Sequence, residues 1–110
     1  MRRPHTYAPA TLDAAAMLGL QIAAARRERR WTVAELAERA GVSLNTLRNA
    51  ERGVPTVAVG VMFELATLLG IALFNVESLE LPSMVARQRE RLALLPAHVR
   101  EAKVQVDDDF

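Results

Sequence analysis

The chain contains no cysteine, few aromatic residues and no long apolar run. Without cysteine it can form no disulfide bridge and no thiolate ligand or nucleophile, which is typical of a reducing compartment. It has no stretch of about 18 apolar residues, so we expect no membrane-spanning helix. Arg2 and Arg3 precede Pro4, His5 and Thr6 rather than the apolar stretch of a secretion signal. The sequence therefore predicts a cytoplasmic protein.

Residues suited to catalysis or metal binding are also scarce. The two histidines, His5 and His98, are isolated, and no second ligand lies at a metal-binding spacing. The chain has no glycine-rich phosphate loop, no Ser/His/Asp set and no paired carboxylates in a recognisable frame. We therefore expect a protein that is not an enzyme and that uses no metal or cofactor.

The net charge of +1 is small, but the charges are unevenly distributed. The first 55 residues hold nine arginines and five acidic residues, whereas the last 55 hold five basic and eight acidic residues. A basic half can face a phosphate backbone even when the whole chain is almost neutral. Hydrophobic residues make up 51% of the chain, which is enough to build a core.

The pattern of apolar residues and caps predicts a helical protein. Residues 1–10 hold two prolines and no periodicity, so we expect a flexible arm. A long helix should follow from Thr11, as its N-cap, to Arg30. Thr32 and Glu35 have the spacing of a capping box, which predicts a helix over residues 33–40.

The chain after this helix is divided by glycines, hydroxyl residues and prolines. Gly41 should end the helix in the left-handed conformation. Four more helices are expected: residues 44–52 capped by Ser43 and ended by Gly53, a helix from after Thr56 to Gly70, a shorter one around 73–79, and a charged one that Ser83 caps beyond Pro82 and that stops before Pro96.

The two short helices are joined by the tight turn Ala40-Gly41-Val42-Ser43, which lets the second helix project into a DNA major groove. The stretch Thr32 to Ser43, followed by Leu47 and Glu51-Arg52-Gly53, resembles the helix-turn-helix of Cro/C1-type (lambda-repressor-like) regulators. Residues 64–71 resemble the fourth helix of that family. The resemblance implies an all-α fold: a compact five-helix lambda-repressor-like DNA-binding domain with an additional C-terminal helix and tail. We assign residues 11–80 to the domain and 81–110 to the helix and acidic tail.

The second short helix is the candidate reading helix. Val42, Leu47 and Ala50 should belong to the core, which leaves the polar side chains outward. Asparagine can pair with adenine through its N6 and N7 groups, and leucine can pack on a thymine methyl group. In the family, residues aligned with Leu44, Asn45 and Asn49 are typical base readers. The candidate DNA-binding residues are Thr32, Val33, Ser43, Leu44, Asn45, Thr46, Arg48, Asn49 and Arg52; of these, Arg48 could take guanine or phosphate.

Two features depart from the family. Val33 stands where relatives usually have glutamine, and the loop from Gly53 to Gly60 is uncharged where many relatives carry basic residues. Both departures suggest weaker anchoring to the DNA backbone, although the backbone N–H groups at the start of the first short helix can still bind a phosphate. The Arg2-Arg3 arm and a cluster of four arginines could compensate, or the cluster could be an ordinary solvated face. These four are Arg26, Arg27, Arg29 and Arg30.

Three residues have expected structural roles. The resemblance implies that Arg26 pairs with Glu51 inside the fold and so holds the reading helix to the first helix. Trp31 precedes the capping box and should pack as a hydrophobic staple against Leu36. A core role is favoured for this tryptophan over stacking on a base.

A lone helix-turn-helix reads few base pairs, so we expect a homodimer on a palindromic operator in double-stranded DNA. The apolar surface for the dimer should come from the helix near Ser83 or from a group that could also pack onto the domain: Leu73, Phe74, Val76, Leu79 and Leu81. The segment after the domain is too short for a ligand-sensing domain, so no small-molecule ligand is expected.

The C-terminal segment, expected to be irregular from residue 97, points to a protein partner. Leu92 to Pro96 and then the sequence Val106-Asp107-Asp108-Asp109-Phe110 resemble the tail of HipB-like antitoxins. The resemblance implies an antitoxin that represses its own operon and binds a HipA-like kinase toxin through residues 106–110. Two alternatives stay open: a standalone repressor, and an adaptor that keeps the fold but binds a protein instead of DNA. A solvated acidic terminus is the ordinary interpretation of such a tail.

Overall fold

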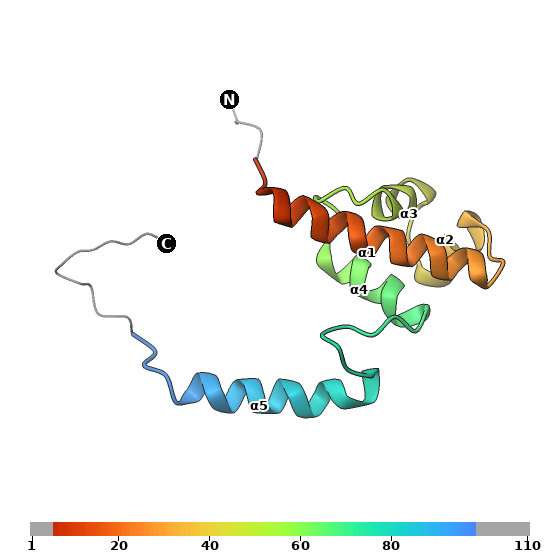
Figure 1. Cartoon of the computed structure of the whole chain (residues 1–110). Helices are drawn as coiled ribbons and strands as arrows, with labels where there is room; N and C mark the ends of the chain where they lie inside the picture. The colour runs from red at the N-terminus through yellow and green to blue at the C-terminus, as the bar shows by residue number, and fades with distance from the viewer. Residues whose placement is uncertain (1–5, 99–110) are drawn as a thin grey trace. The chain divides into compact units, whose positions relative to one another are not determined.

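The computed structural model describes residues 6–98, and helices dominate this part of the chain (Figure 1). The elements in order are α1 (Pro9–Glu28), α2 (Val33–Ala40), α3 (Leu44–Glu51), α4 (Val59–Leu68), the short 3₁₀ helix η1 (Ser78–Glu80) and α5 (Leu81–Ala93). Residues 6–98 contain no strand, only an isolated bridge between Leu73 and Val76. The predicted all-α fold class is confirmed. The chain divides into two units, one ending at Ser78 and one beginning at Leu79.

Helix α1 begins earlier and ends earlier than the sequence predicted. Its N-cap is Ala8 and Pro9 occupies the first turn, where a proline loses no hydrogen bond and has a suitable φ. Thr11 as N-cap is therefore wrong. The helix ends at Glu28 rather than Arg30, because Arg30 has a φ of 60° and the N–H of Trp31 donates to the carbonyl of Arg26 at 3.1 Å. This is a left-handed helix end in which arginine replaces the usual glycine.

The helix-turn-helix forms as the sequence predicted. The Thr32 hydroxyl accepts from the N–H of Glu35 at 3.0 Å, and the Glu35 carboxylate accepts from the N–H of Thr32 at 2.8 Å. Gly41 ends α2 with a φ of 72°. Ser43 then caps α3 by accepting from the N–H of Thr46 at 3.0 Å.

The segment after α4 differs from the prediction. Helix α4 begins at Val59 and ends at Leu68, and Gly70 follows with a φ of 73°. The helix expected around residues 73–79 is wrong. Phe74 and Asn75 have φ values of 58° and 62°, and two successive left-handed residues form a tight turn that no α-helix can contain. Only Ser78–Glu80 form a 3₁₀ turn.

Helix α5 makes up most of the described residues of the second unit. Its N-cap is Glu80 and Pro82 lies in its first turn, so the expected cap at Ser83 is wrong. The Ser83 hydroxyl instead donates to the carbonyl of Glu80 at 3.0 Å. The helix ends at Ala93, before Pro96 as predicted, and none of its residues is buried.

The core of the first unit draws on all four of its α-helices. Ile22, Leu36, Leu47 and Leu65 are fully buried, one from each helix in turn. Helix α1 contacts α3 and α4, and α2 contacts the same two helices. Trp31 is half-buried and packs against this core, in agreement with its expected role. The core therefore holds α3 from behind and leaves its other face uncovered within the unit.

Candidate nucleic-acid interface

Helix α3 has one buried face and one exposed face. Leu47 and Ala50 are fully buried, and Val42 packs partly buried against the same core. The candidate base readers lie on the opposite side. Leu44 is 43% exposed, Asn45, Arg48 and Arg52 are exposed, and Thr46 and Asn49 are half-buried. The structure thus brings the predicted reading residues together on a single helix face.

The residues that begin the two short helices are occupied by capping. The Ser43 hydroxyl donates to the Thr46 hydroxyl at 2.9 Å while it accepts from the backbone of Thr46. The Thr32 hydroxyl is held by Glu35. The half-buried side chain of Val33 packs against the core. The first N–H groups of a helix have no partner within it, and those at the start of α2 can therefore bind a phosphate oxygen.

An ion pair attaches the end of α3 to α1. The Nε and Nη2 atoms of Arg26 donate to the two carboxylate oxygens of Glu51 at 2.7 and 3.0 Å, and Nη1 donates to the carbonyl of Trp31 at 2.9 Å. The two side chains are only 10% and 12% exposed. The hydrogen bonds that Arg26 donates to Glu51 raise the pKa of Arg26 despite the opposing effect of burial. The contact that the resemblance implied is therefore present, and all three groups of Arg26 are engaged.

The backbones of α1 and α3 also meet closely. A Cβ atom built on Gly19 would lie 2.5 Å from the carbonyl oxygen of Ala50, well inside normal contact. Gly53 has a φ of 75°, and a Cβ atom built on it would lie 2.6 Å from the Cα atom of Ala16. Both glycines are needed because a side chain at either position would separate α1 from the end of the reading helix.

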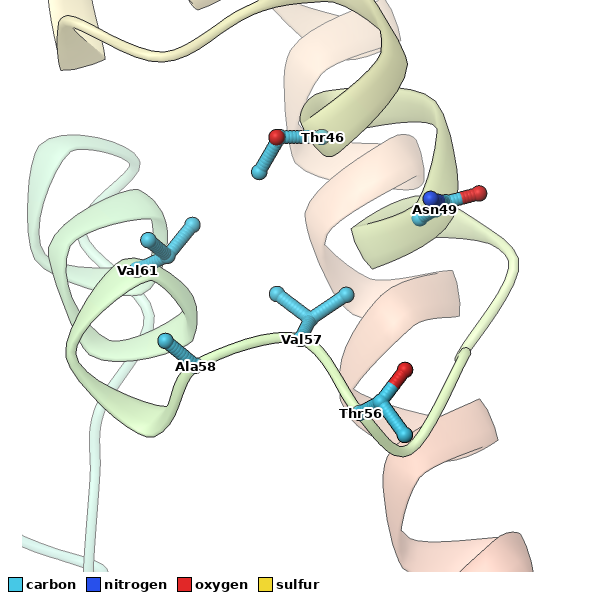
Figure 2. A pocket seen from close by; sticks show the side chains of 6 residues that line it. All are labelled: Thr46, Asn49, Thr56, Val57, Ala58 and Val61. Carbon is cyan, nitrogen blue, oxygen red and sulfur yellow. The ribbon is translucent and has the colours of Figure 1, made fainter. Parts of the chain in front are cut away.

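A hollow of about 300 Å³ lies beside the reading helix (Figure 2). Thr46 and Asn49 reach it from α3, Val61 from α4, and Thr56, Val57 and Ala58 from the loop between them. Val57 and Val61 point into it in Figure 2. None of the six lining residues is charged, so the hollow offers apolar contact and hydroxyl groups but no salt link. The loop residues of this hollow carry no motif that would have predicted their place beside α3, and only their lack of charge stands out in the sequence.

This geometry agrees with the comparison to known families. Residues 22–74 match the family model described as helix-turn-helix. This match supports the resemblance to Cro/C1-type helix-turn-helix regulators. The match spans α2, α3 and α4 together with the end of α1 from Ile22. No curated protein and no solved structure matches the chain.

The helix-turn-helix of residues 22–74 supports a DNA-binding transcription regulator. Its arginine cluster divides into two groups in the structure. Arg26 is buried in its ion pair, so it is removed from the predicted phosphate-binding cluster. Arg27 and Arg30 are exposed. Arg29 lies over the ring of Trp31, with its guanidinium carbon 5.7 Å from the ring centroid.

A further basic residue, Arg39, joins this group. Its guanidinium carbon lies 4.3 Å from the centroid of the Trp31 ring, within the range of a cation–π interaction. This contact could not be predicted from the sequence, because Trp31 precedes α2 and Arg39 lies in the last turn of that helix. The indole therefore holds two guanidinium groups near the helix-turn-helix.

Several of the remaining predicted contact residues lie outside residues 6–98 or outside the first unit. Arg2, Arg3 and the tail residues 106–110 lie outside the described residues. Of the expected dimer surface, Phe74 is 69% exposed and its ring meets Phe63 edge-to-face at 6.1 Å between centroids. Leu79 is 94% exposed and belongs to the second unit. No helix in the described part of the chain is long and apolar enough to cross a membrane.

Proposed function

We propose that the protein is a sequence-specific repressor that binds a palindromic operator as a homodimer. The observation that supports this most is the exposed face of α3, where Leu44, Asn45 and Arg48 project from a helix whose other face is fully buried. A reading helix must keep its position while its side chains meet base edges. The ion pair between Arg26 and Glu51 and the close contact of α1 with α3 supply that rigidity.

Each exposed side chain has a suitable partner in the major groove. Asn45 can pair with the N6 and N7 groups of adenine, and Leu44 can pack on a thymine methyl group. Arg48 can reach guanine or a phosphate. The N–H groups at the start of α2 and the exposed Arg27 and Arg30 provide sequence-independent contacts. Two copies related by twofold symmetry would place their reading helices about 34–36 Å apart on the operator.

A fluorescence-anisotropy titration tests this function. The labelled duplex carries DNA from upstream of the protein's own gene, and a scrambled duplex of equal length is the comparison, each at two salt concentrations. We expect a preference on the order of a thousandfold for the upstream DNA. The double substitution Asn45→Ala/Asn49→Ala should remove at least about thirtyfold of it, because each base contact is worth about 1–3 kcal/mol.

The matched control is Gln88→Ala, which changes an exposed amide on α5, outside the domain. It should leave the preference unchanged. Equal and salt-sensitive binding to both duplexes would mean that the operator lies elsewhere. If neither duplex binds at low salt, the repressor is excluded and the adaptor, which binds a protein partner instead of DNA, takes its place.

We propose further that the repressor is the antitoxin of a toxin–antitoxin pair and neutralises a HipA-like kinase. This rests on the resemblance of residues 92–96 and 106–110 to the tail of HipB-like antitoxins. The end of α5 supports a partner, because Leu92, Leu94 and Leu95 are 69%, 85% and 54% exposed. Such a row of exposed leucines needs an apolar surface to cover it.

Deletion of residues 104–110 tests the antitoxin function. The full chain and the truncated chain are compared for binding to the purified kinase encoded beside the gene, by isothermal titration calorimetry. The truncation should weaken kinase binding and leave operator affinity unchanged. If the full chain does not bind the kinase, the protein is a standalone repressor. If truncation leaves kinase binding intact, the tail has no part in it.

A further inference from the structure

Two polar side chains on the exposed face of α3 are bonded to each other. Asn49 and Arg52 are three positions apart at the end of the helix, so their side chains are neighbours. The Nη2 group of Arg52 donates to the Oδ1 atom of Asn49. A guanidinium group has five donors and no acceptor, so its partner must be the amide oxygen and not the amide nitrogen. The bond therefore fixes which way the Asn49 amide is turned.

This orientation changes what Asn49 presents to DNA. Bidentate recognition of adenine needs an acceptor for the N6 amino group and a donor for N7, side by side. Arg52 donates to one lone pair of the Asn49 oxygen and holds this oxygen toward itself, so the pair offers the DNA mainly N–H donors: those of the amide nitrogen and those left on the guanidinium. Guanine presents two acceptors, O6 and N7, in the major groove. A surface made of donors therefore matches guanine better than adenine.

We propose that Arg52 is a specificity-determining residue that turns the amide of Asn49 toward guanine. The proposal rests on the proposed function, because it requires that α3 reads DNA. Arg52 acts here through Asn49 as a positioning residue, with its own remaining donors adding to the same base contact.

The surroundings of the pair favour this orientation. Among residues 6–98 the one ion pair joins Arg26 to Glu51, so Arg52 has no carboxylate partner there. Arg48, one turn earlier on the helix, is also cationic and offers no acceptor. Turning the Asn49 amide over would place its donors against the donors of Arg52. Asn49 is half-buried at the edge of the hollow in Figure 2, which limits other positions of the side chain.

Asn45 provides a contrast on the same helix. It lies one turn before Asn49 and is exposed, and no side chain in the described part of the chain holds its amide. Its oxygen and nitrogen are both free, so it can present an acceptor and a donor to adenine. The two asparagines should therefore specify different bases although they have the same side chain.

Selection from a pool of random duplexes tests the proposal. The full chain is compared with Asn45→Ala, Asn49→Ala and Arg52→Met. The base pair whose preference disappears in Asn49→Ala is the one that Asn49 contacts, and the full chain should prefer guanine there. Arg52→Met removes every donor of the side chain, and the preference at that base pair should change to adenine by about tenfold. The base pair whose preference disappears in Asn45→Ala is the one that Asn45 contacts. There, both the full chain and Arg52→Met should prefer adenine.

A second substitution guards against a general effect of Arg52→Met. Asn49→Asp keeps an acceptor for Arg52 but removes both N–H donors of the amide, so the guanine preference should be lost. Thermal melting checks that Arg52→Met and Asn49→Asp fold. We expect little change in the melting temperature of Arg52→Met because Arg52 is exposed.

Three results would overturn the proposal. The first is adenine at the Asn49 base pair in the full chain. The second is an Arg52→Met variant that binds all sequences equally less well and with a smaller salt dependence, because Arg52 would then contact a phosphate. The third is a guanine preference that survives Asn49→Asp. If the full chain enriches no sequence, the proposed function fails as well, and this outcome is distinct from the other three.

Discussion

The ion pair between Arg26 and Glu51 leads to a quantitative prediction for stability. Replacing Arg26 with leucine removes two hydrogen bonds to the Glu51 carboxylate and one to the carbonyl of Trp31. The carboxylate, 12% exposed, is then left without a compensating charge. Breaking a buried pair by removing one partner costs about 3–5 kcal/mol, whereas an exposed pair is worth at most about 1 kcal/mol. The burial of both side chains places this pair nearer the first value.

Urea denaturation followed by the fluorescence of Trp31, the single tryptophan of the chain, measures this cost. Arg26→Leu and Glu51→Leu should each lower the free energy of unfolding by about 3–5 kcal/mol. The double variant should lose less than the sum of the two, because leucine packing against leucine leaves no charge buried. Arg27→Leu is the control: it changes an exposed arginine beside Arg26 and should stay within about 0.5 kcal/mol.

Two results would refute this reasoning. If Arg26→Leu lowers the free energy of unfolding by less than about 1 kcal/mol, the pair contributes no more than an exposed ion pair does. A double variant whose loss equals the sum of the single losses would show that the two side chains act independently.

Three more predictions follow from the same domain. Gly19→Ala places a Cβ atom 2.5 Å from the carbonyl of Ala50, so we expect a loss of about 1–3 kcal/mol in thermal melts, whereas Gly60→Ala, which meets nothing within 4 Å, should be neutral or stabilising. Ser43→Ala removes the cap of α3 and should cost about 1 kcal/mol of unfolding free energy in urea; no change would mean that water replaces the hydroxyl. In the folded chain the pKa of Arg26 lies above its ordinary value. The ion pair therefore contributes fully to stability below the pKa that Arg26 has in the unfolded chain, and this contribution is lost only in strongly alkaline solution. Urea titrations should therefore give the same cost of Arg26→Leu at every pH from about 6 to 9, and a cost that falls within this range would contradict the assignment.

The parts of the fold that the sequence predicted well depend on neighbouring residues. The capping box needs only Thr32 and Glu35, three positions apart, and the end of α2 needs only a glycine at position 41. Such local signals do not require knowledge of the rest of the fold. The pairing of Arg26 with Glu51 spans 25 positions, and only the resemblance to a family suggested it.

The predictions of local structure were wrong where one sequence pattern is compatible with two local structures. The apolar residues after Gly70 have a helical spacing, but Phe74 and Asn75 adopt positive φ values, and the chain turns there instead. Ser83 has the residue type of an N-cap, yet α5 already begins at Leu81 and has Pro82 in its first turn. Proline in a first turn and serine as a cap are both common at helix starts, so the sequence alone could not choose between them.

The details of the reading surface could not be predicted for a different reason. The hollow beside α3 exists because the loop of residues 56–58 folds back toward Thr46, and this depends on how α4 packs. The bond between Arg52 and Asn49 depends on the rotamers of two exposed side chains. The spacing of the residues places them on one face, but it does not say which atom of the amide faces outward.

The two faces of α3 carry separate tasks, and this separation affects how the protein can evolve. Leu47, Ala50 and Glu51 hold the helix in the fold, while Leu44, Asn45 and Arg48 are exposed. Substitutions at the exposed positions should therefore change the operator with little effect on stability. A duplicated gene could acquire a new operator through a few such changes, and the copy and its parent would then regulate different genes without first passing through an unstable intermediate.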